Sequence, residues 1–275
     1  MFDSHVHAAP DVVDRLSADV ALGREYARAD ATGFVLKAHY ESTVGRARAV
    51  SDVTGLTVFG GIALNQHTGG ITPAAVAAAL GAGGRVVWMP TADAHTQGAA
   101  GLPRLCDHEP RLPRHAYAVP PVDPSAEEAT DLVLTLVADH DAVLATGHLS
   151  GEECRWLAER ARRFGITRLL FTHPSYTVPG LDPAAVGALV AGGGYAEITA
   201  YQLLHQPGCT PAMLARVAEA AGPALVLSSD AGQPDSPTAP EALRLLIDTL
   251  AAEGLDRSWL TAAASTTPES LFALG

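Results

Sequence analysis

Short apolar runs alternate with helix-like stretches along almost the whole chain. Eight of these runs are rich in Val, Ile, Leu or Phe. Continuous apolar runs are typical of strands that are buried on both faces of a parallel sheet. The pattern therefore predicts strands at residues 2–7, 33–39, 57–64, 85–89, 142–148, 168–173, 194–199 and 224–229.

The stretches between these runs carry the signals of helix ends. Thr72 and Pro73 suit the N-cap and the first position of a helix, and Ser150 with Glu153 forms a capping-box pattern. We predict helices at residues 17–31 (with Ser17 as a cap), 41–53, 73–80, 125–139, 150–164, 182–190, 210–220 and 240–252, and one or two more within 258–274 that cover the barrel.

Eight strands alternating with eight helices predict a single (β/α)8 barrel over residues 1–275, with an open doubly wound sheet as the alternative. One such barrel takes about 250 residues, which suits this length. Residues 92–124 interrupt the alternation and contain His95, His108 and His115. We expect this long segment to be a lid or a specificity loop on the catalytic face, or else a tolerated surface insertion.

Charge and cysteine content narrow the classes of partner. The formal net charge of −12 disfavours nucleic acid, because an acidic chain repels phosphates. No run of about 18 apolar residues is present, so we expect no membrane span. Cys106, Cys154 and Cys209 show no CxxC spacing, which favours reduced thiols in a cytoplasmic protein.

Polar residues end four of the otherwise apolar strands. His5 and His7 end the first strand, His148 the fifth and His173 the sixth, and Asp230 follows the eighth. All strands of a parallel barrel end at one rim, so these side chains should converge there. Imidazoles with a carboxylate suit a divalent metal, with zinc favoured and manganese, iron or nickel as alternatives. Such a metal lowers the pKa of a bound water, and Asp230 could act as the general base.

This ordered pattern, which runs from residue 3 to residue 232, resembles the amidohydrolase superfamily. The compact start is similar to its phosphotriesterase-like, TatD-like and decarboxylase-type branches. Residues 5–11 (HVHAAPD) and 145–150 (ATGHLS) also resemble a bacterial group of uncharacterised amidohydrolase-like proteins. The resemblance implies that His5, His7 and Asp230 hold one metal. It implies that His148 and His173 help to hold a second metal, or that one of them acts in the reaction when only one ion is bound; we assign His173 that catalytic part.

The chain departs from the superfamily pattern at the fourth strand. Binuclear members often bridge their metals there with a carboxylated Lys or a Glu, whereas residues 86–91 offer neither. Lys37 is one substitute as a metal bridge; alternatively it pairs with an acid such as Asp3, or it faces the helices. Glu197 is another, and could bridge, bind substrate or neutralise Lys37.

Further polar residues follow the strands and are candidates for substrate contact. They are His39, Glu197, Asp93, His95 and Tyr201, with Asn65, His67 and His205 as weaker ones. Arg15 could face an anionic substrate group or pair with a neighbouring carboxylate.

The sequence therefore predicts a metal-dependent hydrolase with one or two ions, acting on a small-molecule amide, cyclic amide, lactone or related C–N or C–O bond. A metal-dependent non-oxidative decarboxylase and a phosphoesterase are the alternatives, and a barrel that binds without catalysis is a third class. Whether the chain forms a homo-oligomer is left open.

Overall fold

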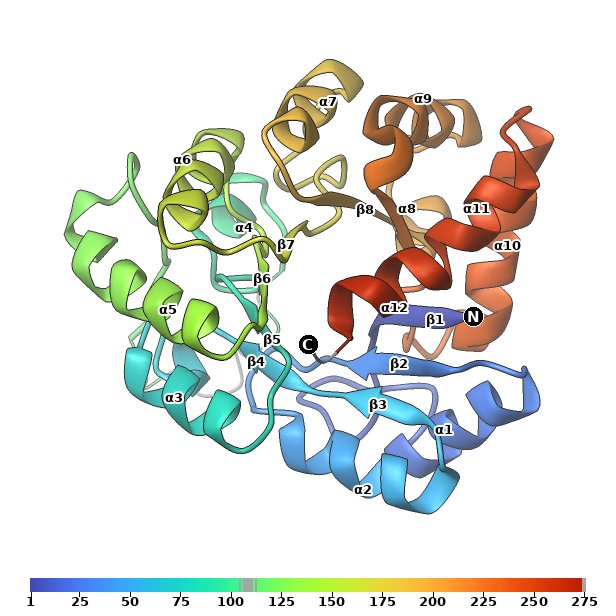
Figure 1. Ribbon diagram of the computed structural model, residues 1–275, viewed down its shortest axis with the longest axis horizontal. Coiled ribbons are helices and arrows are strands. Elements are labelled where there is room, and N and C mark those ends of the chain that lie inside the picture. The colour runs from blue at the N-terminus through green and yellow to red at the C-terminus, as the bar shows by residue number, and fades with distance from the viewer. Residues whose placement is uncertain (104, 106–110, 112, 274–275) are drawn as a thin grey trace.

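The computed structural model describes residues 1–103, 105, 111 and 113–273; Cys106 and His108 lie outside this part of the chain. Strands occupy the centre of the molecule and helices surround them (Figure 1). The paired strands run parallel, in the orders β1-β2-β3 and β4-β5-β6-β7-β8-β9. The strands are β1 (Phe2–Val6), β2 (Gly33–Leu36), β3 (Thr57–Phe59), β4 (Gly61–Ala63), β5 (Val86–Trp88), β6 (Val143–Ala145), β7 (Leu169–Phe171), β8 (Tyr195–Thr199) and β9 (Leu225–Ser228).

The helices follow the strands in regular alternation. They are α1 (Asp19–Arg28), α2 (Val44–Thr54), α3 (Pro73–Gly81), α4 (His95–Ala99), α5 (Glu127–Asp139), α6 (Gly151–Arg163), α7 (Pro183–Ala191), α8 (Ala200–His205), α9 (Pro211–Ala221), α10 (Ala239–Ala252), α11 (Arg257–Ala263) and α12 (Thr266–Phe272). Short 3-10 turns are η1 (Gln66–Thr68), η2 (Pro124–Ala126) and η3 (Gly222–Ala224). None of the helices described has the length and apolarity that crossing a bilayer requires.

Most predicted helices are confirmed, and the differences have local causes. The Ser150–Glu153 capping box starts α6 as expected. Thr72 is the N-cap of α3, but its side chain makes no capping hydrogen bond. The expectation that Ser17 caps the first helix is wrong: α1 begins at Asp19, and the Ser17 hydroxyl donates to Glu25 instead, at 2.6 Å. The short helices α4 and α8 were not predicted.

The strand expected at residues 57–64 is divided into β3 and β4 by Gly60 alone. The residue before α2 packs against the strand here, so a Cβ at Gly60 would lie 2.6 Å from the carbonyl oxygen of Thr43. The Thr43 hydroxyl also accepts a hydrogen bond from the Gly61 backbone at 3.0 Å. The break at Gly60 therefore makes room for the close approach of Thr43. Together, β3 and β4 occupy one strand position of the barrel.

The first and last strands meet and complete the ring. The backbone nitrogen of His7 donates to the Ala231 carbonyl at 2.9 Å, and that of Asp230 donates to the His5 carbonyl at 2.8 Å. A parallel bridge joins Val6 to Ala231. The predicted (β/α)8 barrel is thus confirmed.

One apolar cluster fills the inside of the barrel, and two others pack between the strands and the helices. Its buried members are Phe2, Val35, Ala63, Val86, Trp88, Val143, Ala145, Leu170, Val226, Leu271 and Phe272. The last two come from α12, which covers the end where β1 begins: the Phe272 and Phe2 rings lie 6.1 Å apart. The covered end leaves the opposite rim, where the strands end, for the polar site.

Candidate active site

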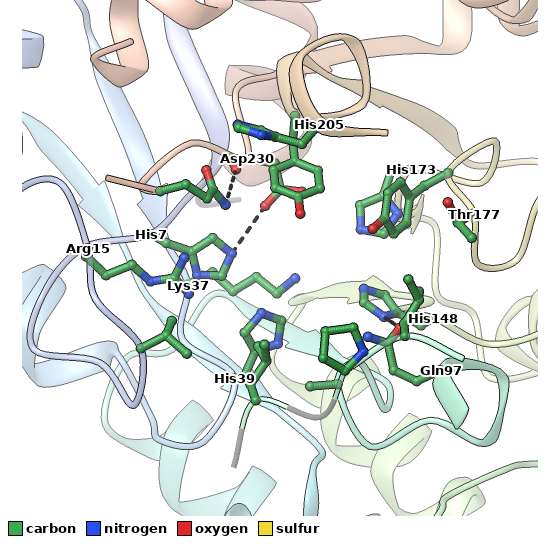
Figure 2. Close-up of a pocket in the computed structure, with 18 of the residues that line it drawn as sticks. His7, Arg15, Lys37, His39, Gln97, His148, His173, Thr177, His205 and Asp230 are labelled. Carbon is green, nitrogen blue, oxygen red and sulfur yellow. Dashed lines mark hydrogen bonds and ion pairs between the residues drawn. The ribbon is translucent and has the colours of Figure 1, made fainter. Parts of the chain in front are cut away.

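The carboxyl ends of the strands surround one cavity. His5 and His7 lie at the end of β1, His148 and His173 follow β6 and β7, and Asp230 follows β9. The cavity has a volume of about 550 Å³, and all of these residues except His5 line it (Figure 2). The strand-end positions thus bring the five side chains to one rim.

Three of these side chains form a compact group that fits a divalent ion. Nε2 of His5 lies 3.1 Å from Oδ1 of Asp230, and Nε2 of His7 lies 3.2 Å from the same oxygen. One ligand atom from each residue lies within 4.8 Å of the others. Ligands at about 2.0–2.2 Å from a zinc ion are separated by distances of this order. Two neutral imidazoles and a carboxylate are a suitable donor set.

Buried partners orient two of the histidines. Oε2 of Glu197 lies 3.3 Å from Nδ1 of His5, and Oε1 of Gln97 lies 3.0 Å from Nδ1 of His148. An acceptor at Nδ1 places the proton there and leaves the lone pair on Nε2, the arrangement that metal-binding histidines use. Glu197 itself accepts from the Ser228 hydroxyl at 2.7 Å. It is fully buried behind His5 and does not line the cavity.

Burial keeps the site histidines neutral. It lowers the pKa of His5 and of His173 to about 3, and it holds the pKa of His7, His39 and His148 well below the usual value. A neutral imidazole is the form that binds a metal. Nδ1 of His173 is also buried without a hydrogen-bond partner among the described residues, as expected of an atom that a bound group satisfies.

Lys37 is the only lysine in the chain, and it lies inside the barrel. Its Nζ lies 3.0 Å from Nε2 of His5 and 5.5 Å from the centre of the Trp88 ring. Burial lowers its pKa to about 8, against the opposing charges of Asp230 and Glu197. The alternatives of pairing with Asp3 or facing the helices are not what the structure shows. Asp3 instead accepts hydrogen bonds from the Tyr26 hydroxyl and the Ser229 backbone, at 2.5 and 3.0 Å.

His39 lines the cavity beside His7, with ring centres 5.0 Å apart. Its Nδ1 lies 2.8 Å from the hydroxyl oxygen of Thr91, which also accepts a hydrogen bond from Nδ2 of Asn65 at 2.6 Å. The oxygen of Asn65 in turn accepts from the backbone of Thr91 and of Asp93. Asn65 is therefore a buried junction between loops rather than a residue of the cavity wall.

Asp93 and His95 do not reach the cavity, because their side chains are engaged elsewhere. Asp93 accepts from the Gln66 backbone at 2.9 Å and from the Tyr40 hydroxyl at 3.2 Å. Nε2 of His95 lies 2.8 Å from Oε2 of Glu153, and neither His95 nor Asp93 is among the lining residues. Both connect loops at the rim.

Glu153 fastens the segment after β5 to the barrel. Besides His95, it accepts hydrogen bonds from the Ser150 backbone at 2.7 Å and from the Val119 backbone at 2.8 Å. Leu102, Pro103 and Leu105 of this segment line the cavity. The described part of residues 92–124 therefore borders the site; its role as a lid or specificity loop stays a prediction.

Aromatic side chains form part of the cavity wall. The Tyr176 ring lies 5.2 Å from His173 and 5.8 Å from Tyr201, which lies 4.8 Å from His205. Tyr201 and His205 were expected, whereas Tyr176 was missed. Its position three residues after His173, in the loop at the same rim, was the available signal. Gln97 was missed without any such signal, since its role depends on its contact with His148.

The backbone is strained where the site residues leave the strands. His173 has φ of 25° and Asp230 has φ of 49°, in the region that non-glycine residues rarely adopt. Next to Asp230, a Cβ at Gly232 would lie 2.4 Å from the carbonyl oxygen of His7. The loop after β9 therefore packs directly against the end of β1, which holds Asp230 over the two histidines.

Comparisons with known proteins show the family and the fold. The chain belongs to DUF6282, a family of unknown function, whose model matches residues 1–197. No curated protein matches the sequence. Among solved structures, the lactonase Lmo2620 from Listeria monocytogenes is similar, with a TM-score of 0.64 at 16% identity. The match covers 100% of this chain and 94% of the lactonase chain.

The organophosphorus hydrolase from Deinococcus radiodurans has a TM-score of 0.58 at 15% identity, with 99% of this chain and 92% of that chain covered. A third similar chain comes from the engineering of organophosphate hydrolysis in a weak promiscuous lactonase template, with a TM-score of 0.59, 15% identity, and coverage of 99% and 94%. At these identities the likeness shows the fold.

Proposed function

We propose that this protein is a metal-dependent hydrolase of the amidohydrolase superfamily. It cleaves a small-molecule amide, cyclic amide, lactone or related C–N or C–O bond, with zinc as the favoured metal. The observation that carries the proposal is the convergence of Nε2 of His5, Nε2 of His7 and Oδ1 of Asp230 at the wall of a cavity. The lactonase among the structures of similar fold supports the choice of reaction.

The residues of the chain divide into holding and reacting groups. His5, His7 and Asp230 would hold the first ion, and His148 and His173 would hold a second together with Lys37, once the lysine is carboxylated. A divalent ion supplies Lewis acidity and makes water acidic enough to ionise near neutral pH. Asp230 is the carboxylate nearest to such a water and would be the group that accepts its proton.

Substrate contacts come from the cavity wall. His39 presents Nε2 to the cavity, where it is placed to donate a hydrogen bond to the carbonyl oxygen of the bond that breaks. Tyr201 lies on the aromatic wall and packs against the rest of the substrate. With one ion bound, His173 would instead act in the reaction; because burial keeps its imidazole neutral, it is suited to accept a proton.

The test is metal content combined with turnover. Wild-type protein purified without chelator is expected to hold one or two zinc ions and to hydrolyse members of a panel of lactones and cyclic amides. Asp230→Asn should lose an ion and at least about 100-fold in kcat/KM. Asp248→Asn, on the exposed surface of α10, is the matched control and should change neither. A wild-type protein that holds no metal after exposure to zinc or manganese would overturn the proposal.

Arg15 at the cavity wall is the observation that favours a second candidate, a metal-dependent non-oxidative decarboxylase. Such an enzyme needs a cation beside a substrate carboxylate. Release of CO2 from an aromatic carboxylic acid panel, with no hydrolysis of lactones, would select this candidate over the first.

A further inference from the structure

Arg15 brings a buried positive charge to the cavity. It lies in the loop between β1 and α1 and lines the cavity, with only 4% of its side chain exposed. Nε donates to Oδ2 of Asp11 at 2.7 Å, and Nη2 lies 2.6 Å from the same oxygen. Asp11 therefore fixes one edge of the guanidinium. Nη1 makes no hydrogen bond within the described residues, so the other edge is available to a ligand.

The charge of Arg15 reaches the metal-ligand side of the cavity. Figure 2 shows Arg15 on the same side as His7 and Lys37. Arg15, His7, Lys37 and Asp230 all line this one cavity. An anion bound at Arg15 therefore lies close to the candidate metal ligands.

Asp230 also lines the cavity, but its Oδ1 lies against His5 and His7, at 3.1 and 3.2 Å, rather than in an ion pair with Arg15. Asp14 and Asp235 also line it, but both are exposed at its mouth, where water and salt screen them. Asp11 already offsets part of the Arg15 charge. A monoanion such as a carboxylate matches the remaining charge and the free guanidinium edge better than a doubly charged phosphate.

Another part of the cavity wall is suited to an apolar or planar body. Tyr176 and Tyr201 meet edge to face, with ring centres 5.8 Å apart, and both line the cavity. Leu102 and Pro103 add apolar surface from the segment after β5. The cavity thus combines a cation, a metal-ligand group and an aromatic wall within about 550 Å³, a volume within the range of small-molecule sites.

We propose that the substrate is a small organic acid whose carboxylate binds Arg15 while its apolar body packs against Tyr176 and Tyr201. The carboxylate is a recognition group, and the bond that is hydrolysed lies beside His7 and Asp230. The bond-breaking part of this inference rests on the proposed function, whereas the binding part does not.

The test compares two probes of the same shape and different charge, phenylacetate and phenylacetamide, by calorimetric titration of the metal-loaded protein. Wild type should bind phenylacetate at least about tenfold more tightly. Arg15→Gln should weaken phenylacetate binding by about 10- to 100-fold and leave phenylacetamide unchanged. Arg48→Gln, which removes an exposed arginine of α2, is the control and should keep the preference.

Equal affinity for the two probes in wild type would overturn the inference. So would a preference that survives in Arg15→Gln, which is the result expected if the carboxylate binds the metal itself. Arg15→Lys keeps the charge but loses the planar fork, so it should retain only part of the preference and provides the test if Arg15→Gln does not fold.

Metal content and lactone turnover of the same samples separate this inference from the proposed function. Discrimination between the probes by a protein without metal would refute the hydrolase and leave the carboxylate site standing. Metal binding and lactone turnover by a protein that does not discriminate between the probes would support the hydrolase and refute the carboxylate site.

Discussion

The hydroxyl oxygen of Thr91 lies 2.8 Å from Nδ1 of His39, and this contact distinguishes His39 from His5 and His148. Thr91 is fully buried, and its oxygen already accepts a hydrogen bond from Asn65. Its own proton needs an acceptor, and Nδ1 of His39 is the one within reach. His39 is therefore protonated on Nε2 and faces the cavity as a donor. His5 and His148 are protonated on Nδ1, where each has an acceptor, and keep the lone pair on Nε2.

We predict that nitrogen chemical shifts from long-range 1H–15N spectra of the metal-free protein at pH 7 will show this division. His39 should appear as the Nε2–H tautomer, and His148 as the Nδ1–H tautomer. Thr91→Val removes the hydroxyl donor and should shift His39 towards Nδ1–H, with Thr135→Val, on the exposed side of α5, as a control. An Nδ1–H tautomer for His39 in wild type would contradict the prediction.

Lys37 gives an unusually clean test of a lysine bridge, because no second lysine exists in the chain. If Lys37 is carboxylated, protein prepared in 13C-bicarbonate with zinc will show a carbamate carbon signal that Lys37→Ala lacks. The N-terminal amine is present in both samples and serves as the internal control. Metal content should fall from about two ions to about one or none. About one ion in both proteins, without a carbamate signal, would remove Lys37 from the centre.

The metal-free protein should lose stability as pH falls below about 6.5. The five site histidines have lowered pKa values in the folded state, so the unfolded chain binds more protons once pH drops below the ordinary histidine pKa. Asp3, with a pKa raised to about 6, and Glu197 and Asp230, also raised, act in the opposite direction. Because the five histidines outnumber these three acids, the net effect of lowering the pH is a loss of stability.

The free energy of unfolding should therefore fall by about 1.4 kcal/mol per pH unit for each excess proton. Urea unfolding at pH 7, 6 and 5 measures it. Saturating zinc should delay the fall, because protons and metal compete for the same nitrogens. A flat profile between pH 7 and pH 5 would show that the histidines are not held neutral.

Glu153→Gln tests how the segment after β5 is fastened. The Glu153 carboxylate is fully buried and lies within hydrogen-bond distance of three donor groups, on His95, Val119 and Ser150. In the Gln variant the side-chain NH2 group would face at least one of these donors. We expect a loss of about 2–4 kcal/mol in unfolding free energy and faster hydrogen exchange in α4. Glu152→Gln, on the exposed face of the same turn, should cost less than about 0.5 kcal/mol. Equal losses in the two variants would refute the anchoring role.

The sequence predicted the barrel and the converging residues because both depend on local pattern. Alternation of apolar runs with capped helices is readable residue by residue, and strand-end positions such as His148 and Asp230 follow from it. Contacts between distant segments were not readable. Glu197 was expected to bridge, bind substrate or neutralise Lys37; its charge does oppose that of Lys37, but its contact with His5 from behind could not be read from the sequence.

Loop residues were the hardest to predict. Asp93 and His95 follow a strand just as His148 does, yet the course of a loop decides whether its side chains point inward. The short helix α4 has no apolar repeat of its own, and its Gln97 is recognised only through its contact with His148.

The candidate metal centre spans the seam where β1 meets the loop after β9. His5 and His7 are synthesised more than two hundred residues before Asp230. The ligand set therefore cannot assemble on a nascent chain until nearly the entire barrel has emerged from the ribosome. An ion bound there would link the first strand to the last. Its binding free energy would add directly to the stability of the closed barrel.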